Sequence, residues 1–117
     1  MRDLTPGDYL VFQLEAGFGL LRLLAVDEKD GDFVWHLTAF SNLFPSVEAA
    51  EEAIVGCGLQ KSIEHVALNN RAFESTQVSA VANLPVTSEE NAKLDEWRLS
   101  QDQPISDRSI RLLMGLR

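Results

Sequence analysis

Two histidines and one cysteine have the widest chemical range in this chain, so their spacing is the first test for an active or metal site. They are His36, Cys57 and His65. A metal centre needs three or four ligands that converge in space, and none of these residues stands at a short ligand spacing from another. His36 falls in the middle of an apolar segment, where a hydrogen-bonded structural histidine is typical. We therefore expect no metal and no cofactor.

Nucleophilic and phosphate-binding motifs give no stronger signal. Cys57 stands between Gly56 and Gly58, just after a predicted helix, and a helix C-terminus disfavours the thiolate. No G-x-S-x-G elbow is present. The segment 17–19, Gly-Phe-Gly, lacks both the Lys-Ser/Thr ending of a P-loop and the third glycine of a dinucleotide loop. We assign no catalytic residue and expect a non-enzymatic protein with a dispensable cysteine.

The C-terminal segment is the least ordinary part of the chain. It carries Arg108, Arg111 and Arg117 without an acid after Asp107. It also has more apolar side chains than one face of a short helix can bury. One interpretation is a helix docked on the sheet with Arg111 at the rim. The other is a segment that binds a protein partner or a second copy of the chain, most simply as a two-fold dimer. The candidate partner-binding residues are Arg111, Met114, Leu116 and Arg117.

Composition restricts the class of partner. The 117 residues are 45% hydrophobic and 24% charged, as in an ordinary globular domain, and we expect a single domain over 1–117. The net charge of −8 disfavours nucleic acid and anionic membranes and allows a basic protein partner. No apolar run is long enough for a membrane span, and the first residues are too polar for a signal peptide. A single cysteine excludes an internal disulfide, so we expect a cytoplasmic protein.

The first 40 residues predict a three-stranded antiparallel meander over 7–14, 18–26 and 33–40. Asp30-Gly31 is typical of a type I′ turn, which pairs Val26 with Trp35, Leu24 with Leu37, and Arg22 with Ala39. A three-residue loop at 15–17 pairs Leu14 with Phe18, Phe12 with Leu20, and Leu10 with Arg22. These pairs place an almost wholly apolar set on the core face: Leu10, Phe12, Leu14, Phe18, Leu20, Leu24, Val26, Phe33, Trp35 and Leu37.

The second face of this sheet is mixed, and its Leu21, Leu23, Val34 and Phe40 are too apolar to face water. The sheet is therefore either curled into a half-barrel or covered by helices on its back. Arg22, the one charge in the middle strand, is expected near the rim, with its charged end in solvent.

The remaining segments predict helices and two weaker strands. Ser46 caps a helix over 47–55 that ends at Gly56. Strands are expected over 63–68 and 77–82, with a turn at Asn69-Asn70. Thr87 and Glu90 form a capping box for a helix to about Leu99, with Leu94 and Trp97 inward. Ser106 or Asp107 begins a short last helix. The fold class is α+β, a curled antiparallel sheet of four or five strands with one helix after the third strand and two C-terminal helices.

The opening segment resembles the start of small bacterial toxin-immunity-type domains. The residues that carry this resemblance are the strand 7–14, which begins Gly-Asp, and the glycine turn 17–19. It implies a non-catalytic protein that blocks a toxin by binding it, with an acidic surface suited to a basic target. The alternative is a small enzyme or ligand-binding domain with a pocket between sheet and helices, lined by Arg22, Trp35, His36 and Cys57.

Overall fold

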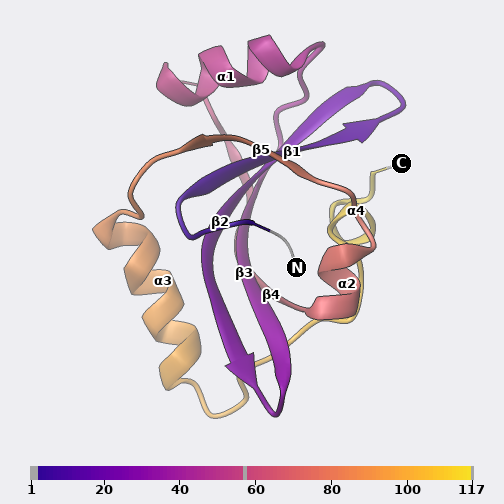
Figure 1. The fold of residues 1–117 in the computed structure, drawn as a ribbon. Helices are drawn as coiled ribbons and strands as arrows, with labels where there is room; N and C mark the ends of the chain where they lie inside the picture. The colour runs from indigo at the N-terminus through magenta and orange to yellow at the C-terminus, as the bar shows by residue number, and fades with distance from the viewer. Residues whose placement is uncertain (1–2, 57, 117) are drawn as a thin grey trace.

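The computed structural model describes residues 3–56 and 58–116, so Cys57 and Arg117 lie outside the described residues. It has the predicted α+β fold, an open five-stranded antiparallel sheet with an N-terminal meander (Figure 1). The strands are β1 (Asp8–Leu14), β2 (Gly17–Lys29), β3 (Asp32–Phe40), β4 (Lys61–Asn69) and β5 (Ser79–Asn83). The helices are α1 (Val47–Val55), α2 (Asn70–Glu74), α3 (Ser88–Leu99) and α4 (Ile110–Met114).

The sheet runs in the order β4-β3-β2-β1-β5, and helices cover both of its faces. Figure 1 shows α2 and α4 together on one side and α1 and α3 on the other. This arrangement satisfies the expectation that the second face of the meander needs cover. In the described segments, no helix is long and apolar enough to cross a membrane.

The first hairpin is shifted by one residue from the predicted register, so that prediction was wrong. Leu14 pairs with Gly17 around a two-residue loop, and Phe12 pairs with Gly19 rather than Leu20. The reason is steric. A Cβ atom at Gly19 would lie 2.3 Å from the ring of Phe12, so the ring occupies the space that only glycine leaves. The shift also replaces the predicted pair of Leu10 and Arg22.

The second hairpin agrees with the prediction at its turn and departs from it further along. Asp30 and Gly31 both have positive φ, at 54° and 81°, and Val26 pairs with Trp35 as predicted. A bulge at Leu24 then shifts the register, so that Leu37 faces Leu23, and Arg22 faces Thr38 instead of Ala39. A bulge inserts one residue that has no partner on the neighbouring strand. No residue of this segment indicates a bulge at the level of the sequence.

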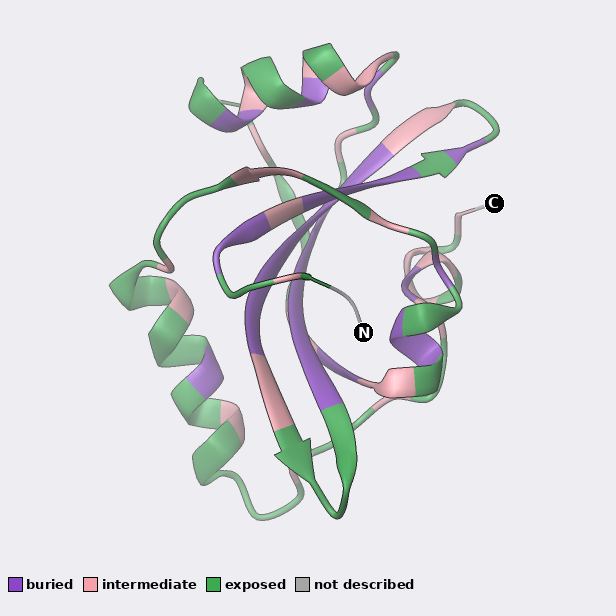
Figure 2. Cartoon of the chain, viewed as in Figure 1, coloured by how far each residue is buried: buried purple, intermediate pink, exposed green. Residues whose placement is uncertain are grey.

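These two register changes exchange residues between the faces of β2. The α2–α4 face carries the larger core, and Leu21 and Leu23 belong to it instead of to the second face. Leu20 packs on the other face in a core that includes Ala50 and Ile54 of α1. Figure 2 shows the buried residues concentrated in the middle of β1, β2 and β3, with the hairpin tip exposed.

Helix ends follow the predicted caps except in two short helices. Ser46 caps α1, and Thr87 with Glu90 forms the capping box of α3. The predicted turn at Asn69-Asn70 is instead the start of α2, because the Asn69 side chain accepts from the backbone of Ala72. The last helix is capped by Ser109 rather than Ser106 or Asp107. The predicted strands over 63–68 and 77–82 correspond to β4 and β5.

Arg22 is buried and ion-paired, which corrects the prediction of a residue near the rim. Its side chain is 2% exposed, and its Nε lies 3.1 Å from Oε2 of Glu90, a carboxylate that is 10% exposed. The guanidinium also donates to the carbonyl oxygens of Gly7 (2.5 Å) and Pro85 (2.8 Å). Its Cζ stands 4.5 Å from the centre of the Tyr9 ring. The charge thus joins β2 to the loop before β1 and to the segment from Pro85 to Glu90, which lies more than sixty positions away in the sequence.

Replacing Glu90 with glutamine tests this buried pair. Glutamine keeps the capping box but leaves the guanidinium without a counter-charge, and breaking a buried pair from one side costs about 3–5 kcal/mol. We expect Glu90→Gln to lower the free energy of unfolding in urea by about 3 kcal/mol. Its neighbour Glu89 is exposed in the same first turn. Glu89→Gln is therefore the matched control and should change the free energy of unfolding by less than about 0.5 kcal/mol. Equal effects of the two variants would contradict the role given to Arg22.

Candidate functional site

The structure places the predicted partner-binding residues on α4 and just after it, where they do not form one exposed patch. Met114 and Leu116 are partly buried and pack against the larger core, together with Leu113. Arg111 borders a surface hollow, and Arg117 lies outside the described residues. Leu112 is the residue of α4 that stays in solvent, at 64% exposed. Most apolar side chains of this segment therefore pack against the core of the chain itself.

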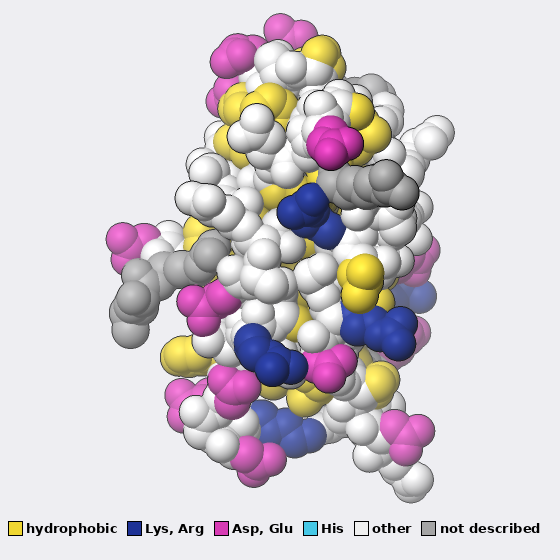
Figure 3. All heavy atoms as spheres, turned by 90° about the vertical axis from the view of Figure 1, so that its right-hand side faces the viewer, with side chains coloured by type: hydrophobic (Ala, Val, Ile, Leu, Met, Phe, Trp, Pro, Cys, Tyr) yellow, Lys and Arg dark blue, Asp and Glu magenta, His cyan; other side chains and the backbone are white. Residues whose placement is uncertain are grey.

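The hollow beside Arg111, which we call the Arg111 hollow, lies at the edge of the sheet. Its volume is about 480 Å³, and its polar lining is Gln13, Thr76, Gln77, Ser79 and Arg111. Its apolar lining comes from β1, β2, β5 and α1. The pairing of β1 with β5 ends at Val11 and Ser79, so the hollow opens where β5 leaves the edge of β1. Figure 3 views the molecule from the side of α2 and α4 and shows basic, acidic and hydrophobic side chains interspersed on this face.

Two residues that line this hollow each have one buried side-chain atom without a hydrogen-bond partner among the described residues. Within the described part of the chain, the buried side-chain atoms without a hydrogen bond are Oγ1 of Thr76 and Nε of Arg111. Thr76 is 4% exposed. Buried polar groups are almost always hydrogen-bonded, so each exception calls for a cause such as a bound molecule or ion.

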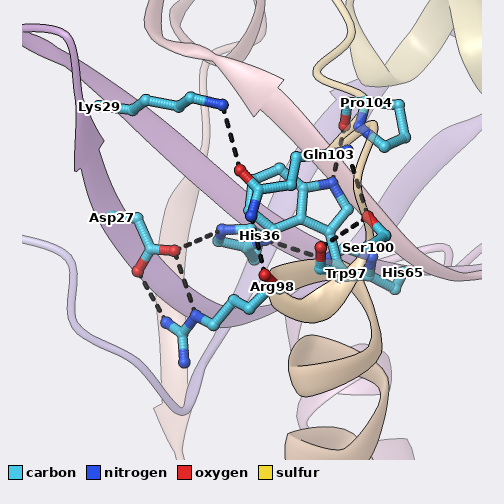
Figure 4. A network of polar contacts seen from close by, with 9 residues as sticks. All are labelled: Asp27, Lys29, His36, His65, Trp97, Arg98, Ser100, Gln103 and Pro104. Atoms are coloured by element: carbon cyan, nitrogen blue, oxygen red, sulfur yellow. Dashed lines mark hydrogen bonds and ion pairs between the residues drawn. The ribbon is translucent and has the colours of Figure 1, made fainter.

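The second candidate is a network of titratable side chains under α3 (Figure 4). The Nδ1 atom of His36 lies 2.9 Å from Nε2 of His65, and its Nε2 lies 3.0 Å from Oδ2 of Asp27. Arg98 donates to both oxygens of Asp27, at 2.7 and 3.3 Å. The indole of Trp97 meets the His36 ring edge-on, with centroids 4.7 Å apart. The network joins β2, β3 and β4 to the last turn of α3.

The hydrogen bonds fix the protonation pattern of the neutral pair. The Asp27 carboxylate can only accept, so His36 donates from Nε2 and its Nδ1 accepts from Nε2–H of His65. Burial, with the nearby His36 as a smaller cause, lowers the pKa of His65 to about 4. Burial also lowers the pKa of His36, against the opposing charge of Asp27. Burial alone would raise the pKa of Asp27, but its hydrogen bond and ion pair with Arg98 and the nearby His36 hold it below the ordinary value.

An Asp–His–His chain resembles the base of a nucleophilic site, yet it lacks the other parts. Among the described residues, no hydroxyl or thiol donates a hydrogen bond to His65. His36 is fully buried and uses both ring nitrogens within the network. No group of three or more side chains in the described residues is arranged to hold a metal ion. The network is suited to fastening α3 to the sheet, and the absence of metal stays a prediction, since Cys57 is outside the described residues.

Sequence reasoning considered the two histidines as unrelated. Both lie on strands, and the pairing of β3 with β4, in which His36 faces Ala67, puts His65 diagonally beside it on the same face. Asp27 lies beside His36 in the predicted pairing as well as in the observed one, because both place it opposite Val34. The sequence does not reveal how β3 pairs with β4, because the connection between these strands includes a helix and therefore fixes no register.

A third feature is an apolar hollow at the β2–β3 hairpin and α2, which we call the Trp35 hollow. It has a volume of about 480 Å³ and is lined by Leu4, Pro6, Val26, Phe33, Trp35, Asn70 and Glu74. The Trp35 ring stacks on Phe73 with centroids 4.0 Å apart, and its Nε1–H donates to Asn70 over 3.0 Å. The Asn70 amide donates in turn to the Glu74 carboxylate. Trp35 is therefore held in one orientation.

The four residues proposed to line an enzyme pocket are not brought together. Arg22 is sealed in its ion pair, His36 is fully buried, and Trp35 lines a hollow that contains neither of them. Cys57 lies outside the described residues. A comparison of the chain with models of protein families, with curated proteins and with solved structures found no match.

The low pKa of His65 predicts acid sensitivity. In the unfolded chain a histidine takes up a proton near pH 6.5, whereas folded His65 does so only near pH 4. The unfolded state therefore binds more protons in this window, and stability that is present above pH 6.5 is lost as the pH falls toward 4. We expect the free energy of unfolding to fall by about 2 kcal/mol between pH 7 and pH 5. In His65→Gln, urea titrations over the same range should show a much smaller fall, and an unchanged slope would contradict the assignment.

Trp97 supplies a second test of the same network. It was predicted to be mostly buried. The structure has it partly buried, with its Nε1–H donating to the Pro104 carbonyl over 2.8 Å. Because the ring shields the histidines, Trp97→Ala should cost about 2–3 kcal/mol and should also move the pKa of His65 up toward its ordinary value. NMR titration of the His65 ring protons measures this shift. Leu99→Ala, at an 85% exposed site of the same helix, is the control and should change neither quantity.

Proposed function

We propose that this chain is a non-enzymatic protein-binding module that holds a basic partner through the Trp35 hollow. The observation that carries the proposal is an apolar hollow whose lining includes an aromatic side chain held in one orientation, with acids beside it. Phe33, 43% exposed, lies edge-on to Trp35 with centroids 6.5 Å apart. Aromatic side chains in preformed pockets are the usual anchors of protein interfaces.

The charge around the Trp35 hollow supports a basic partner. Glu74 lines it, and Glu28 pairs with Phe33 across the hairpin and so shares the face of Val26 and Trp35. Both carboxylates are exposed. The net charge of −8 adds a long-range attraction for a positively charged protein and repels an acidic one. The resemblance of the opening strand to toxin-immunity-type domains gives the proposal a specific form, in which the partner is a basic toxin that is blocked by binding.

An enzyme or small-ligand domain remains the alternative class. Its predicted lining residues do not share a pocket in the described structure, and the Asp27–His36–His65 network satisfies itself internally. Cytoplasmic residence stays a prediction from the single cysteine. Self-association through the C-terminal segment also stays a prediction, and it now rests on Leu112 rather than on Met114 or Leu116, because the latter two pack on the core.

Site-specific photo-crosslinking tests the binding face. We expect a benzoylphenylalanine at position 33 to crosslink one basic protein in a native lysate, because the side chain would lie at the centre of the interface. The same probe at position 99, an 85% exposed leucine on the far face, is the matched control and should give no such product.

Charge reversal then tests why the partner binds. Replacing Glu28 and Glu74 with lysine should reduce the crosslinked product at least tenfold, since two attractive charges become repulsive. The control is Glu48→Lys with Glu51→Lys on α1, which makes the same change in net charge away from the hollow. Equal products from positions 33 and 99, or equal losses from both pairs of charge reversals, would contradict the proposal.

A further inference from the structure

We propose that the Arg111 hollow binds the carboxylate group of a ligand with a small apolar body. This site lies at the β1–β5 edge and shares no lining residue with the Trp35 hollow. The inference therefore goes beyond the proposed function and does not depend on it.

The first argument is the pair of unsatisfied polar groups. Nε of Arg111 and Oγ1 of Thr76 are buried without a hydrogen bond among the described residues, and both side chains border one hollow. Leaving a buried donor unpaired is costly, and more so for a charged group. A ligand oxygen in the hollow would give the Arg111 guanidinium and the Thr76 hydroxyl the partner that they lack.

The second argument concerns the charge of the ligand. Arg111 is the one charged side chain among the described lining residues, and it forms no ion pair with another described residue, unlike Arg22 and Arg98. An arginine fork matches the two oxygens of a carboxylate in one plane. The single positive charge of the guanidinium balances a monoanion, and the Thr76 hydroxyl can donate one further hydrogen bond. A phosphate dianion would keep an uncompensated charge in an acidic protein.

The third argument is the rest of the lining. Val11, Phe18, Val47 and Val81 supply apolar contacts, and the volume of about 480 Å³ falls in the range of small-molecule sites. An alkyl or aryl group attached to the carboxylate would therefore be held as well. The two unsatisfied atoms are themselves shielded from water. A ligand can therefore reach them only when side chains that border the hollow move aside.

Titration with hexanoate, followed by ¹⁵N NMR of the arginine Nε–H and backbone signals, tests the proposal. We expect the Arg111 Nε–H and the amides of β5 to shift, with binding that weakens as salt is added. Hexanamide has the same shape without the charge and should bind at least tenfold more weakly. Absence of any shift with hexanoate and with the peptide described below, or equal binding of the amide and the acid, would overturn the proposal.

Two variants separate recognition from folding. Arg111→Met keeps an unbranched stem without the guanidinium and should reduce hexanoate binding at least tenfold, while Arg108→Met, at an exposed site of the same segment that does not line the hollow, should leave it unchanged. Thr76→Val removes an unpaired hydroxyl, so the melting temperature should stay the same or rise while binding weakens several-fold. A lower melting temperature with unchanged binding would show that the hydroxyl serves the fold and would overturn its role in the site.

A peptide arm identifies the source of the carboxylate. Acetyl-Ala-Ala-Leu with a free C-terminus carries the same group as hexanoate at the end of a chain, and its amidated form is the control. Binding of hexanoate and of the free peptide alike supports carboxylate recognition regardless of source. Binding of the free peptide alone supports it and assigns the carboxylate to a polypeptide end. Equal binding of the amidated and free peptides would overturn it.

Discussion

The buried charge of Arg22 is the constraint around which the packing of this protein is organised. A guanidinium in the middle of the central strand β2 cannot be left without partners, because an unpaired buried charge costs several kcal/mol. Its partners come from the loop before β1, from the connection after β5 and from the first turn of α3. One side chain thus fixes where three segments meet the sheet, including segments more than sixty positions away in the sequence.

The α3 helix shows why such constraints are needed. Its sequence is strongly polar, and Leu94 is its one buried residue, so apolar burial alone holds the helix weakly. The helix is instead attached at both ends by polar contacts: Glu90 binds Arg22 in the first turn, and Arg98 binds Asp27 in the last. Trp97 covers the two histidines between β3 and β4. The titratable network that first suggests catalysis is better understood as the second of these attachments.

Local signals predicted the elements well and their pairing less well. The Asp30-Gly31 turn and the caps at Ser46 and Thr87 act over a few residues, so the sequence shows them directly. The register at Gly19 depends on the ring of Phe12 in a neighbouring strand, and the bulge at Leu24 is a feature of the pairing of β2 with β3. Both are tertiary effects that an alternating pattern cannot reveal, and each moves side chains to the opposite face. The candidate site follows the same logic: Arg111 could be singled out from its segment, whereas its proximity to Thr76 required the fold.

Alternation along β2 explains how one hairpin serves two faces. Val26 and Glu28 point to the side of the Trp35 hollow, while Asp27 between them belongs to the histidine network. The contacts of Asp27 with His36 and Arg98 therefore hold this part of β2 in place. The opposite face of the same segment carries Glu28, which pairs with Phe33. The Arg111 hollow stands apart from this arrangement, at the sheet edge where the pairing of β1 with β5 ends and where buried side-chain atoms of Thr76 and Arg111 have no hydrogen bond among the described residues. Polar groups left unpaired at such an edge gain nothing for the fold, so their presence there is best explained by a ligand.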